Sequence, residues 1–300
     1  MINYTSRLFA NFSLIALISL SSITFCSCSK ASKNEPEIKP GLSLGIASIP
    51  NLRDMGGYKT ASGATIARGL LYRSNQLLNI SSEDMLLLAQ LNLKSDFDLR
   101  TEKERGDYPD ELPASVNNVW LDVLADDPNS GPANLIELLR DPLKANEELG
   151  DGKVEDLFML AYCQFISLES AKSAFRELFL SLGDKNKLPA LFHCTTGKDR
   201  TGWAAAAFLT LMGVPMDVVI EDYMRSNEYI LPMYTTLIQQ FVDGGGVRSI
   251  PEAILGVKEE YLRAAFDEMQ SKYGSIENYF SKALGITTTQ QIAIKNLYLN

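Results

Sequence analysis

The strongest constraint on the fold is a cysteine and an arginine, separated by five residues, between a segment that predicts a strand and one that predicts a helix. Cys194 follows the compact apolar run 189–193, which predicts a buried strand, and Arg200 begins the alanine-rich run 200–212, which predicts a helix. Gly197 lets the short loop between them turn without a Cβ clash. A strand, a tight loop and a helix in this order bring backbone N–H groups together around an anion.

The same loop carries the side chains that phosphate-ester chemistry needs. Arg200 offers a planar fork of N–H groups that matches two phosphate oxygens. The positive end of the helix and this guanidinium favour the thiolate form of Cys194, which is the nucleophilic form. Cys194 is therefore predicted to form a covalent phosphocysteine. Asp199 is the nearest acid for the leaving oxygen, and the rival acids are Asp122, Asp126 and Asp127.

The only histidine of the chain, His193, excludes several other chemistries. A histidine-rich zinc site cannot form, nor can a triad with its histidine elsewhere, and a papain-type pair would lack its distant base. We expect His193 to orient the loop through a ring N–H, and proton transfer is the less favoured role. Thr201 is expected to hydrogen-bond the thiolate. The predicted reaction uses no metal and no cofactor.

The loop sequence His-Cys-Thr-Thr-Gly-Lys-Asp-Arg-Thr-Gly at 193–202 resembles the signature of the protein tyrosine phosphatase superfamily. It is more similar to the bacterial tyrosine phosphatases related to a secreted mycobacterial enzyme, protein tyrosine phosphatase B. The resemblance covers most of the chain after its N-terminal segment, through the segments Asn51–Asp54, Gly69–Ser74, Asp98–Thr101, Tyr223–Tyr229 and Tyr273–Glu277.

The resemblance implies a role for each residue of the loop. Cys194 would be the nucleophile, Arg200 the phosphate clamp and Asp199 an acid within the loop. Lys198 would lie near the phosphate, and such a lysine also accompanies activity on phosphoinositides. Thr196 stands where the family usually has alanine, so loop hydrogen bonds are expected to differ there. The implied phosphate-binding residues are Thr195, Thr196, Gly197, Lys198, Asp199 and Arg200.

Strands alternate with helices along the rest of the chain, which is typical of an α/β sheet. Strands are predicted at 70–73, 93–99, 116–123 and 189–193. Helices are predicted from Ser81 onward, and at 154–182 with a break near Ser167, 200–212, 216–226, 258–273, 276–283 and 288–298. The expected fold is therefore tyrosine phosphatase-like, with a central sheet flanked by helices, the Cys-x5-Arg phosphate loop between a strand and a helix, and a helical C-terminal part.

Two polar segments interrupt this pattern. Residues 126–152 contain three prolines and predict a long excursion with one short helix. The related mycobacterial enzyme covers its site with a helical lid, and either 126–152 or 231–256 would play that part here. Cys163 lies in an apolar helical pattern and is interpreted as a buried small hydrophobe. A reversible disulfide with Cys194 is the less favoured alternative.

Several charged residues are candidates for supporting the pocket. We expect this role for Asp54 and Arg100. Three further arginines either line the pocket or form ordinary ion pairs: Arg53, Arg73 and Arg105.

The N-terminal segment predicts export. The apolar run 8–25 follows Arg7 and is interrupted by serines, which is typical of a signal peptide and not of a membrane-spanning anchor. The sequence Phe25-Cys-Ser-Cys28 resembles a bacterial lipoprotein processing site, with Cys28 as the acceptor preferred over Cys26. The expected domains are a signal at 1–28, a tether at 29–41 and a catalytic domain at 42–300. An exported lipoprotein, periplasmic or at the cell surface, would contact the membrane only through its acyl chains, and plain secretion is the alternative.

The charge of the chain limits its partners. The net charge is −9, and removing residues 1–28, which contain one arginine and no other charged residue, would bring it to −10. An acidic body argues against a nucleic-acid binder. The expected partners are phosphorylated proteins or phosphoinositides.

The predicted function is a protein tyrosine phosphatase, with dual or triple specificity as an extension. The alternatives are a phosphoinositide phosphatase and a non-catalytic phosphate-binding module at the cell surface. A rhodanese-type sulfur-transfer enzyme uses a loop of a different size. An arsenate reductase needs resolving cysteines that this chain hardly has, because the body retains only Cys163 besides Cys194.

Overall fold

The computed structural model describes residues 39–127 and 133–300. The predicted signal, the processing site at Cys28 and most of the tether lie outside the described residues. None of the described helices is long and apolar enough to cross a membrane.

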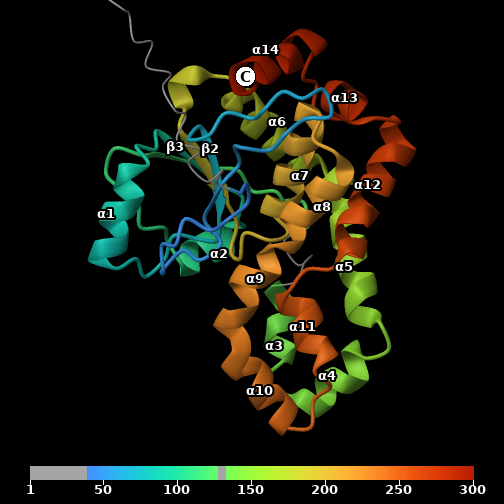
Figure 1. Ribbon diagram of the computed structural model, residues 1–300. Coiled ribbons are helices and arrows are strands. Elements are labelled where there is room, and N and C mark those ends of the chain that lie inside the picture. The colour runs from blue at the N-terminus through green and yellow to red at the C-terminus, as the bar shows by residue number, and fades with distance from the viewer. Residues whose placement is uncertain (1–38, 128–132) are drawn as a thin grey trace, which may run out of the picture. The chain divides into compact units, whose positions relative to one another are not determined.

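A five-stranded sheet lies at the centre of the described chain, in the order β1-β2-β5-β3-β4 (Figure 1). The strands are β1 (Arg53–Asp54), β2 (Leu71–Ser74), β3 (Ser95–Asp98), β4 (Asn117–Trp120) and β5 (Ala190–His193). Strand β1 pairs antiparallel with β2, and the other pairs are parallel. Ser74 and Asp98 both lie opposite His193, so β2, β5 and β3 end at the same level. The segments that follow these strands therefore gather at one edge of the sheet, where α/β folds place their ligands.

Side chains alternate between the two faces of the sheet because a strand has a period of two residues. Leu71, Phe97 and Phe192 belong to the large hydrophobic core, together with the helix α7 (Arg200–Met212). Tyr72 and Leu191 belong to a smaller core on the other face, which includes Leu88 of α1 (Ser82–Gln90). By the same alternation, His193 faces the α1 side and Arg73 faces the α7 side.

The predicted helices are present, with two of them divided. The run 154–182 forms α5 (Lys153–Ser167) and α6 (Glu169–Leu182), so the break lies at Leu168. The run 216–226 gives α8 (Met216–Met224), followed by α9 (Ser226–Ile230). The C-terminal part contains α12 (Glu259–Tyr273), α13 (Ile276–Asn278), a π-helical turn at Tyr279–Ala283 and α14 (Thr288–Tyr298). Ser81 caps α1 by accepting the backbone N–H of Asp84, as its sequence predicts.

The excursion after β4 contains more helix than its sequence predicts. Two short helices form there, α3 (Ala133–Leu138) and α4 (Pro142–Leu149), where one was expected. Asp141 caps α4 and Pro142 occupies its first turn, so local signals start a second helix despite the polar composition.

The two segments considered as a lid pack against each other. The amide of Asn146 on α4 donates to the carbonyl of Gly245 at 2.9 Å and accepts the N–H of Val247 at 2.9 Å. These partners lie between α10 (Thr235–Asp243) and α11 (Ser249–Leu255). Figure 1 shows α3, α4, α10 and α11 together, beyond the end of α5. These contacts join the two segments into one helical layer. That this layer covers the site stays a prediction.

Cys163 is half-buried, in contrast to the expected full burial. Its sulfur lies 3.7 Å from the carbonyl oxygen of Ala264 on α12. Cys163 and Cys194 are both free thiols in the structure.

Candidate active site

The loop from Cys194 to Asp199 connects β5 to the first turn of α7. The Cys194 side chain is only 1% exposed, so its sulfur lies at the base of the loop. Gly197 has a φ of +69°, and a Cβ added there would lie 2.1 Å from the carbonyl oxygen of Ser74. A glycine is therefore required, because the loop presses against the end of β2 in a left-handed conformation.

Glu104 holds the guanidinium of Arg200 in place. This residue lies on α2 (Glu102–Asp107), and its carboxylate accepts both terminal nitrogens of Arg200, at 2.6 and 2.7 Å. It also accepts the hydroxyl of Thr195 at 2.5 Å. Burial alone would raise the pKa of the Glu104 carboxyl, but the charge and hydrogen bonds of Arg200 and the hydroxyl of Thr195 hold it well below its usual range. A bidentate pair of this kind fixes the plane of the arginine fork.

Glu104 is not among the site residues predicted from the sequence, although the sequence around it contains a helix-capping signal. Thr101 and Glu104 form a capping box at the start of α2, and the Thr-x-x-Glu spacing predicts such a box. The box explains how the helix begins. The pairing with an arginine 96 residues away depends on the tertiary structure.

Replacing Glu104 with Gln should weaken the orientation of Arg200 without emptying the site. The amide can hold one nitrogen of the fork but carries no charge, so we expect kcat/KM for an aryl phosphate to fall by up to about 100-fold. Glu102→Gln on the same helix is the matched control, because Glu102 is exposed. Steady-state kinetics of both variants test this, and equal losses in the two would contradict a specific role for Glu104.

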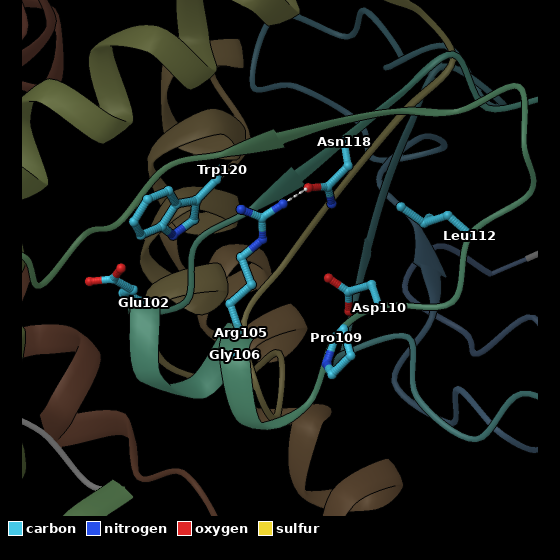
Figure 2. A pocket seen from close by; sticks show the side chains of 8 residues that line it. All are labelled: Glu102, Arg105, Gly106, Pro109, Asp110, Leu112, Asn118 and Trp120. Carbon is cyan, nitrogen blue, oxygen red and sulfur yellow. Dashed lines mark hydrogen bonds between the residues drawn. The ribbon is translucent and has the colours of Figure 1, made fainter.

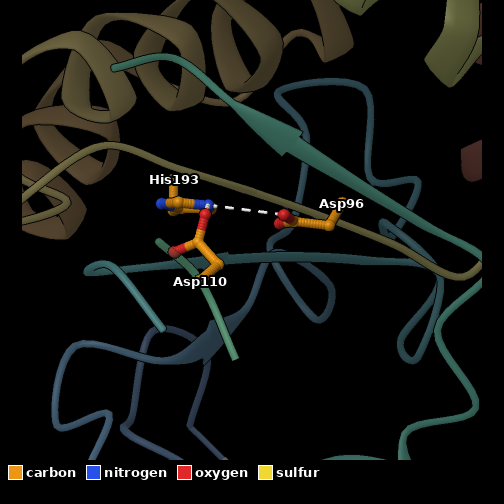
Figure 3. A group of neighbouring side chains, drawn as sticks. All are labelled: Asp96, Asp110 and His193. Carbon is orange, nitrogen blue, oxygen red and sulfur yellow. Dashed lines mark ion pairs between the residues drawn. The ribbon is translucent and has the colours of Figure 1, made fainter. Parts of the chain in front are cut away.

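His193 is fully buried beneath the loop, in contact with acidic side chains (Figure 3). Its Nε2 lies 3.4 Å from carboxylate oxygens of both Asp96 and Asp110, and its Nδ1 lies 3.2 Å from the carbonyl oxygen of Cys194. Burial alone would lower the pKa of the imidazole, but Asp96 and Asp110 raise it well above its usual value. A raised pKa favours the protonated ring, which can donate to the loop backbone, and this fits the orienting role expected from the sequence.

The ligand atoms of Asp96, Asp110 and His193 lie within 4.8 Å of one another, as in a small cation site. Cations of the protein already offset most of the negative charge around this cluster. Arg100 forms ion pairs with Asp98 and Asp110, and the imidazolium adds a further positive charge. The cluster is therefore an internal ion-pair network behind the nucleophile.

The raised pKa of His193 predicts how the free energy of unfolding depends on pH. A raised folded-state pKa stabilises the fold fully below the unfolded value of 6.5, and this contribution is lost as the pH rises through the folded value. We expect both ring nitrogens to be protonated at pH 7.5. Nitrogen NMR of the chain without a histidine tag measures this directly, because only one imidazole is present. A neutral ring at that pH would contradict the network, and Asp96→Asn should lower the titration midpoint.

Asp199 and Lys198 are paired with each other inside the protein. The ammonium of Lys198 lies 2.9 and 2.8 Å from the two carboxylate oxygens of Asp199, and 4.6 Å from the centre of the Phe158 ring. The hydroxyl of Tyr162 donates to Asp199 at 3.0 Å and lies 2.7 Å from that of Tyr223. Asp199 is therefore held as an ion-paired carboxylate, turned into the core. The ammonium of Lys198 is thus paired with Asp199 and does not lie where a phosphate is expected.

The three rival acids have different surroundings. Asp126 accepts the backbone N–H of Ser170, and Asp127 accepts the side-chain amide of Gln164, so both anchor their segment to the helices α5 and α6. Asp122 accepts the backbone N–H of Glu102 at 3.2 Å. Burial raises the pKa of Asp122 above its ordinary value, against the opposing effects of backbone hydrogen bonds and the charge of Arg200. The charge of Arg200 therefore acts on the carboxyl of Asp122.

The remaining residues expected at the site are of two kinds: some contact the loop or its partners, and others hold the surrounding structure together. The carboxylate of Asp54 accepts the N–H groups of Gly56 and Gly69, which organises a turn, and neither bond involves the loop. Arg100 belongs to the acidic cluster and also donates to the side chain of Gln76, whose backbone N–H donates to the loop carbonyl of Thr195. The hydroxyl of Thr201 is buried, and no hydrogen bond joins it to Cys194 in the described structure. Arg53 and Arg73 form ion pairs with Asp222 of α8.

A cavity of about 500 Å³ lies beside α2, away from the nucleophile (Figure 2). Arg105 lies over the ring of Trp120 there and donates to the side chain of Asn118 at 2.7 Å. No residue of the loop 194–200 lines this cavity. Its position behind the helix that carries Glu104 makes it a neighbour of the site and not the substrate pocket.

Comparison with known proteins agrees with the geometry of the loop. A profile of the tyrosine phosphatase family matches residues 44–300. A Cupriavidus necator protein named as a tyrosine-protein phosphatase is 29% identical over 82% of this chain and 86% of its own. The triple specificity protein phosphatase PtpB of Mycobacterium tuberculosis is 28% identical over 80% of this chain and 94% of its own.

Among solved structures, the catalytic core of Siw14 aligns with 63% of this chain and 83% of its own at 15% identity, with a TM-score of 0.30. That score is too low to support an argument about this fold. The family match alone spans most of the described residues and includes the strand, the Cys-x5-Arg loop and the helix that follows it. The chain therefore belongs to the tyrosine phosphatase family.

Proposed function

We propose that this phosphatase hydrolyses phosphate monoesters through a phosphocysteine at Cys194. One observation carries the proposal: a buried cysteine at the base of the loop, with the guanidinium of Arg200 fixed beside it by Glu104. Binding a phosphate needs the guanidinium but no nucleophile next to it. Their combination favours catalysis over the non-catalytic phosphate-binding module.

The reaction proceeds in two displacements at phosphorus. The thiolate of Cys194 attacks phosphorus, the bond to the leaving oxygen breaks, and an acid protonates that oxygen. Water then attacks the phosphocysteine, the sulfur–phosphorus bond breaks, and the same carboxylate accepts the proton from the water. Arg200 and the loop N–H groups stabilise the charge on the equatorial oxygens during both steps.

Asp122 is the acid in this proposal, in place of Asp199. Asp199 is occupied by Lys198 and Tyr162 inside the core, whereas the pKa of Asp122 is raised by burial and its carboxyl lies within the field of Arg200. A raised pKa keeps the proton available at higher pH, which an acid catalyst requires. This changes the assignment that the position of Asp199 within the loop suggested.

Phosphotyrosine is the proposed principal substrate, with phosphoserine, phosphothreonine and phosphoinositides as further substrates. Support comes from the family and from the relative in Mycobacterium tuberculosis that is named a triple specificity phosphatase. A buried sulfur favours a long, flat phosphate ester, because a phenyl ring can carry the phosphate to the base of the loop.

The test is a substrate panel with the purified full-length chain. We expect the highest kcat/KM on phosphotyrosine peptides, and lower values on phosphoserine peptides and on phosphatidylcholine vesicles that contain phosphoinositides. Hydrolysis confined to the vesicles would favour the phosphoinositide phosphatase. Phosphate binding without any hydrolysis would favour the binding module.

The lipoprotein anchor and the export of the chain are proposals that the sequence alone supports. Residues 1–28 have the composition of a secretory signal, and Cys28 is the proposed site of lipidation. Mass spectrometry of the mature N-terminus tests this, since an unmodified residue at position 28 or an intact Met1 would exclude lipidation there.

A further inference from the structure

Two buried side chains outside the Cys-x5-Arg loop hold its backbone from the outside. The amide of Asn51 donates to the carbonyl oxygens of Thr196 at 3.1 Å and of Gly197 at 3.2 Å. The guanidinium of Arg73, at the end of β2, donates to the carbonyl of Gly197 at 2.8 Å. Asn51 and Arg73 are each 0% exposed, so water does not compete for these bonds.

These contacts decide where the loop N–H groups point. In a trans peptide the carbonyl and the following N–H point in opposite directions within one plane. Fixing the carbonyls of Thr196 and Gly197 on the outer side therefore turns the N–H groups of Gly197 and Lys198 towards the inner side. Because Gly197 could otherwise adopt many conformations, the loop gains most from such external bonds at this residue.

Arg73 is itself fixed by a buried charge cluster. Asp222 of α8 accepts Arg73 at 2.7 Å, Arg53 at 2.8 Å and the hydroxyl of Tyr58 at 2.6 Å. Burial alone would raise the pKa of Asp222, but the two arginines lower it, so the carboxylate is ionised. Two guanidinium groups share this one carboxylate. One positive charge of the cluster is therefore left uncompensated directly behind the loop, where it favours a bound anion.

We propose that Asn51 and Arg73 are positioning residues that set the affinity of the loop for the phosphoryl group. They hold two N–H donors in the binding orientation before the substrate arrives, so no free energy is spent on ordering the loop. Arg73 adds the charge of its cluster from the α7 side of the sheet, while His193 supports the loop from the α1 side. The inference rests on the proposed function, because it deepens the role of the same loop.

The experiment compares Asn51→Ala and Arg73→Lys with Tyr58→Phe in the full-length chain. Tyr58→Phe is the matched control, because it removes a hydrogen bond to Asp222, and within the described residues no hydrogen bond joins Tyr58 to the loop. The readouts are the inhibition constant of inorganic phosphate against an aryl phosphate, KM and kcat separately, and the thermal midpoint. We expect the two test variants to raise the inhibition constant by about 10-fold, the size of one lost hydrogen bond to a charged group.

A purely structural role would lower the thermal midpoint of all three variants and leave the inhibition constant within about twofold of wild type; that result overturns the inference. If Arg73→Lys does not fold, Asn51→Ala decides alone, since it leaves the charge cluster intact. Failure of the proposed function is distinguishable, because the wild-type chain would then not hydrolyse the aryl phosphate, whether or not it binds inorganic phosphate. Hydrolysis by wild type with unchanged phosphate affinity in the variants overturns only this inference.

Discussion

Replacing Cys194 with Ser should lower kcat on an aryl phosphate by at least about 10⁴-fold, as removal of a catalytic nucleophile does in other covalent enzymes. The hydroxyl of serine is not ionised at neutral pH, so it cannot attack phosphorus from the base of the loop. The loop N–H groups and Arg200 remain in place, because Cys194 contributes no side-chain hydrogen bond to them in the described structure. The variant should therefore still bind phosphate.

Calorimetry of phosphate binding and burst-phase kinetics measure the two halves of this prediction. Cys163→Ser is the matched control, because Cys163 lies on α5 against α12, and this substitution should leave kcat within about twofold of wild type. Substantial activity in Cys194→Ser would exclude the phosphocysteine mechanism. Retained activity in Cys194→Ser together with a loss in Cys163→Ser would identify Cys163 as the nucleophile.

Replacing Asp122 with Asn should slow the hydrolysis of phosphoserine by about 10²–10⁴-fold, the range of general acid catalysis. An alkoxide leaves poorly without a proton, and the amide cannot supply one. On p-nitrophenyl phosphate the loss should be small, because nitrophenolate leaves as a stable anion. The wild-type rate on phosphoserine should fall as the pH rises through the raised pKa of Asp122, whereas Asp122→Asn should lose that limb of the profile.

Asp126→Asn is the matched control, since its carboxylate bonds to Ser170 in the same segment. It should behave as wild type on both substrates. Asp199→Asn tests the competing hypothesis that Asp199 is the acid. If Asp122 is the acid, this variant should disturb Lys198 and Tyr162 and lower the rates on both substrates equally. A loss in Asp199→Asn that is confined to phosphoserine, with Asp122→Asn unaffected, would return the acid to the loop.

Much of the fold was predictable because local signals determine it. The helices 200–212 and 288–298 lie where their periodicity places them, and the four predicted strands form within three residues of their expected ends. The very short strand β1 is not among the predicted strands, since two residues carry no periodic pattern. The second helix of the 126–152 excursion was missed because its cap and proline lie in a segment of polar composition.

The candidate site was predictable only where its residues are neighbours in sequence. Cys194, Gly197 and Arg200 belong to one loop, and the geometry of a strand, a turn and a helix brings them together without help from the rest of the chain. Asp54 shows the limit of this reasoning. It was expected to support the pocket, yet its carboxylate organises a turn while Arg53 joins the buried cluster of Asp222.

The sequence by itself determined a phosphate-binding loop with a nucleophile and a clamp, in an α/β chain of the tyrosine phosphatase type. Only the tertiary structure decided which distant residues hold that loop: Glu104 on the clamp, Asp96 and Asp110 on His193, and Asn51 and Arg73 on the backbone. The physical reason is the parallel register of β2, β5 and β3, which end at one level and bring their following segments together. Strand order depends on long-range packing, which the local sequence around each residue does not encode.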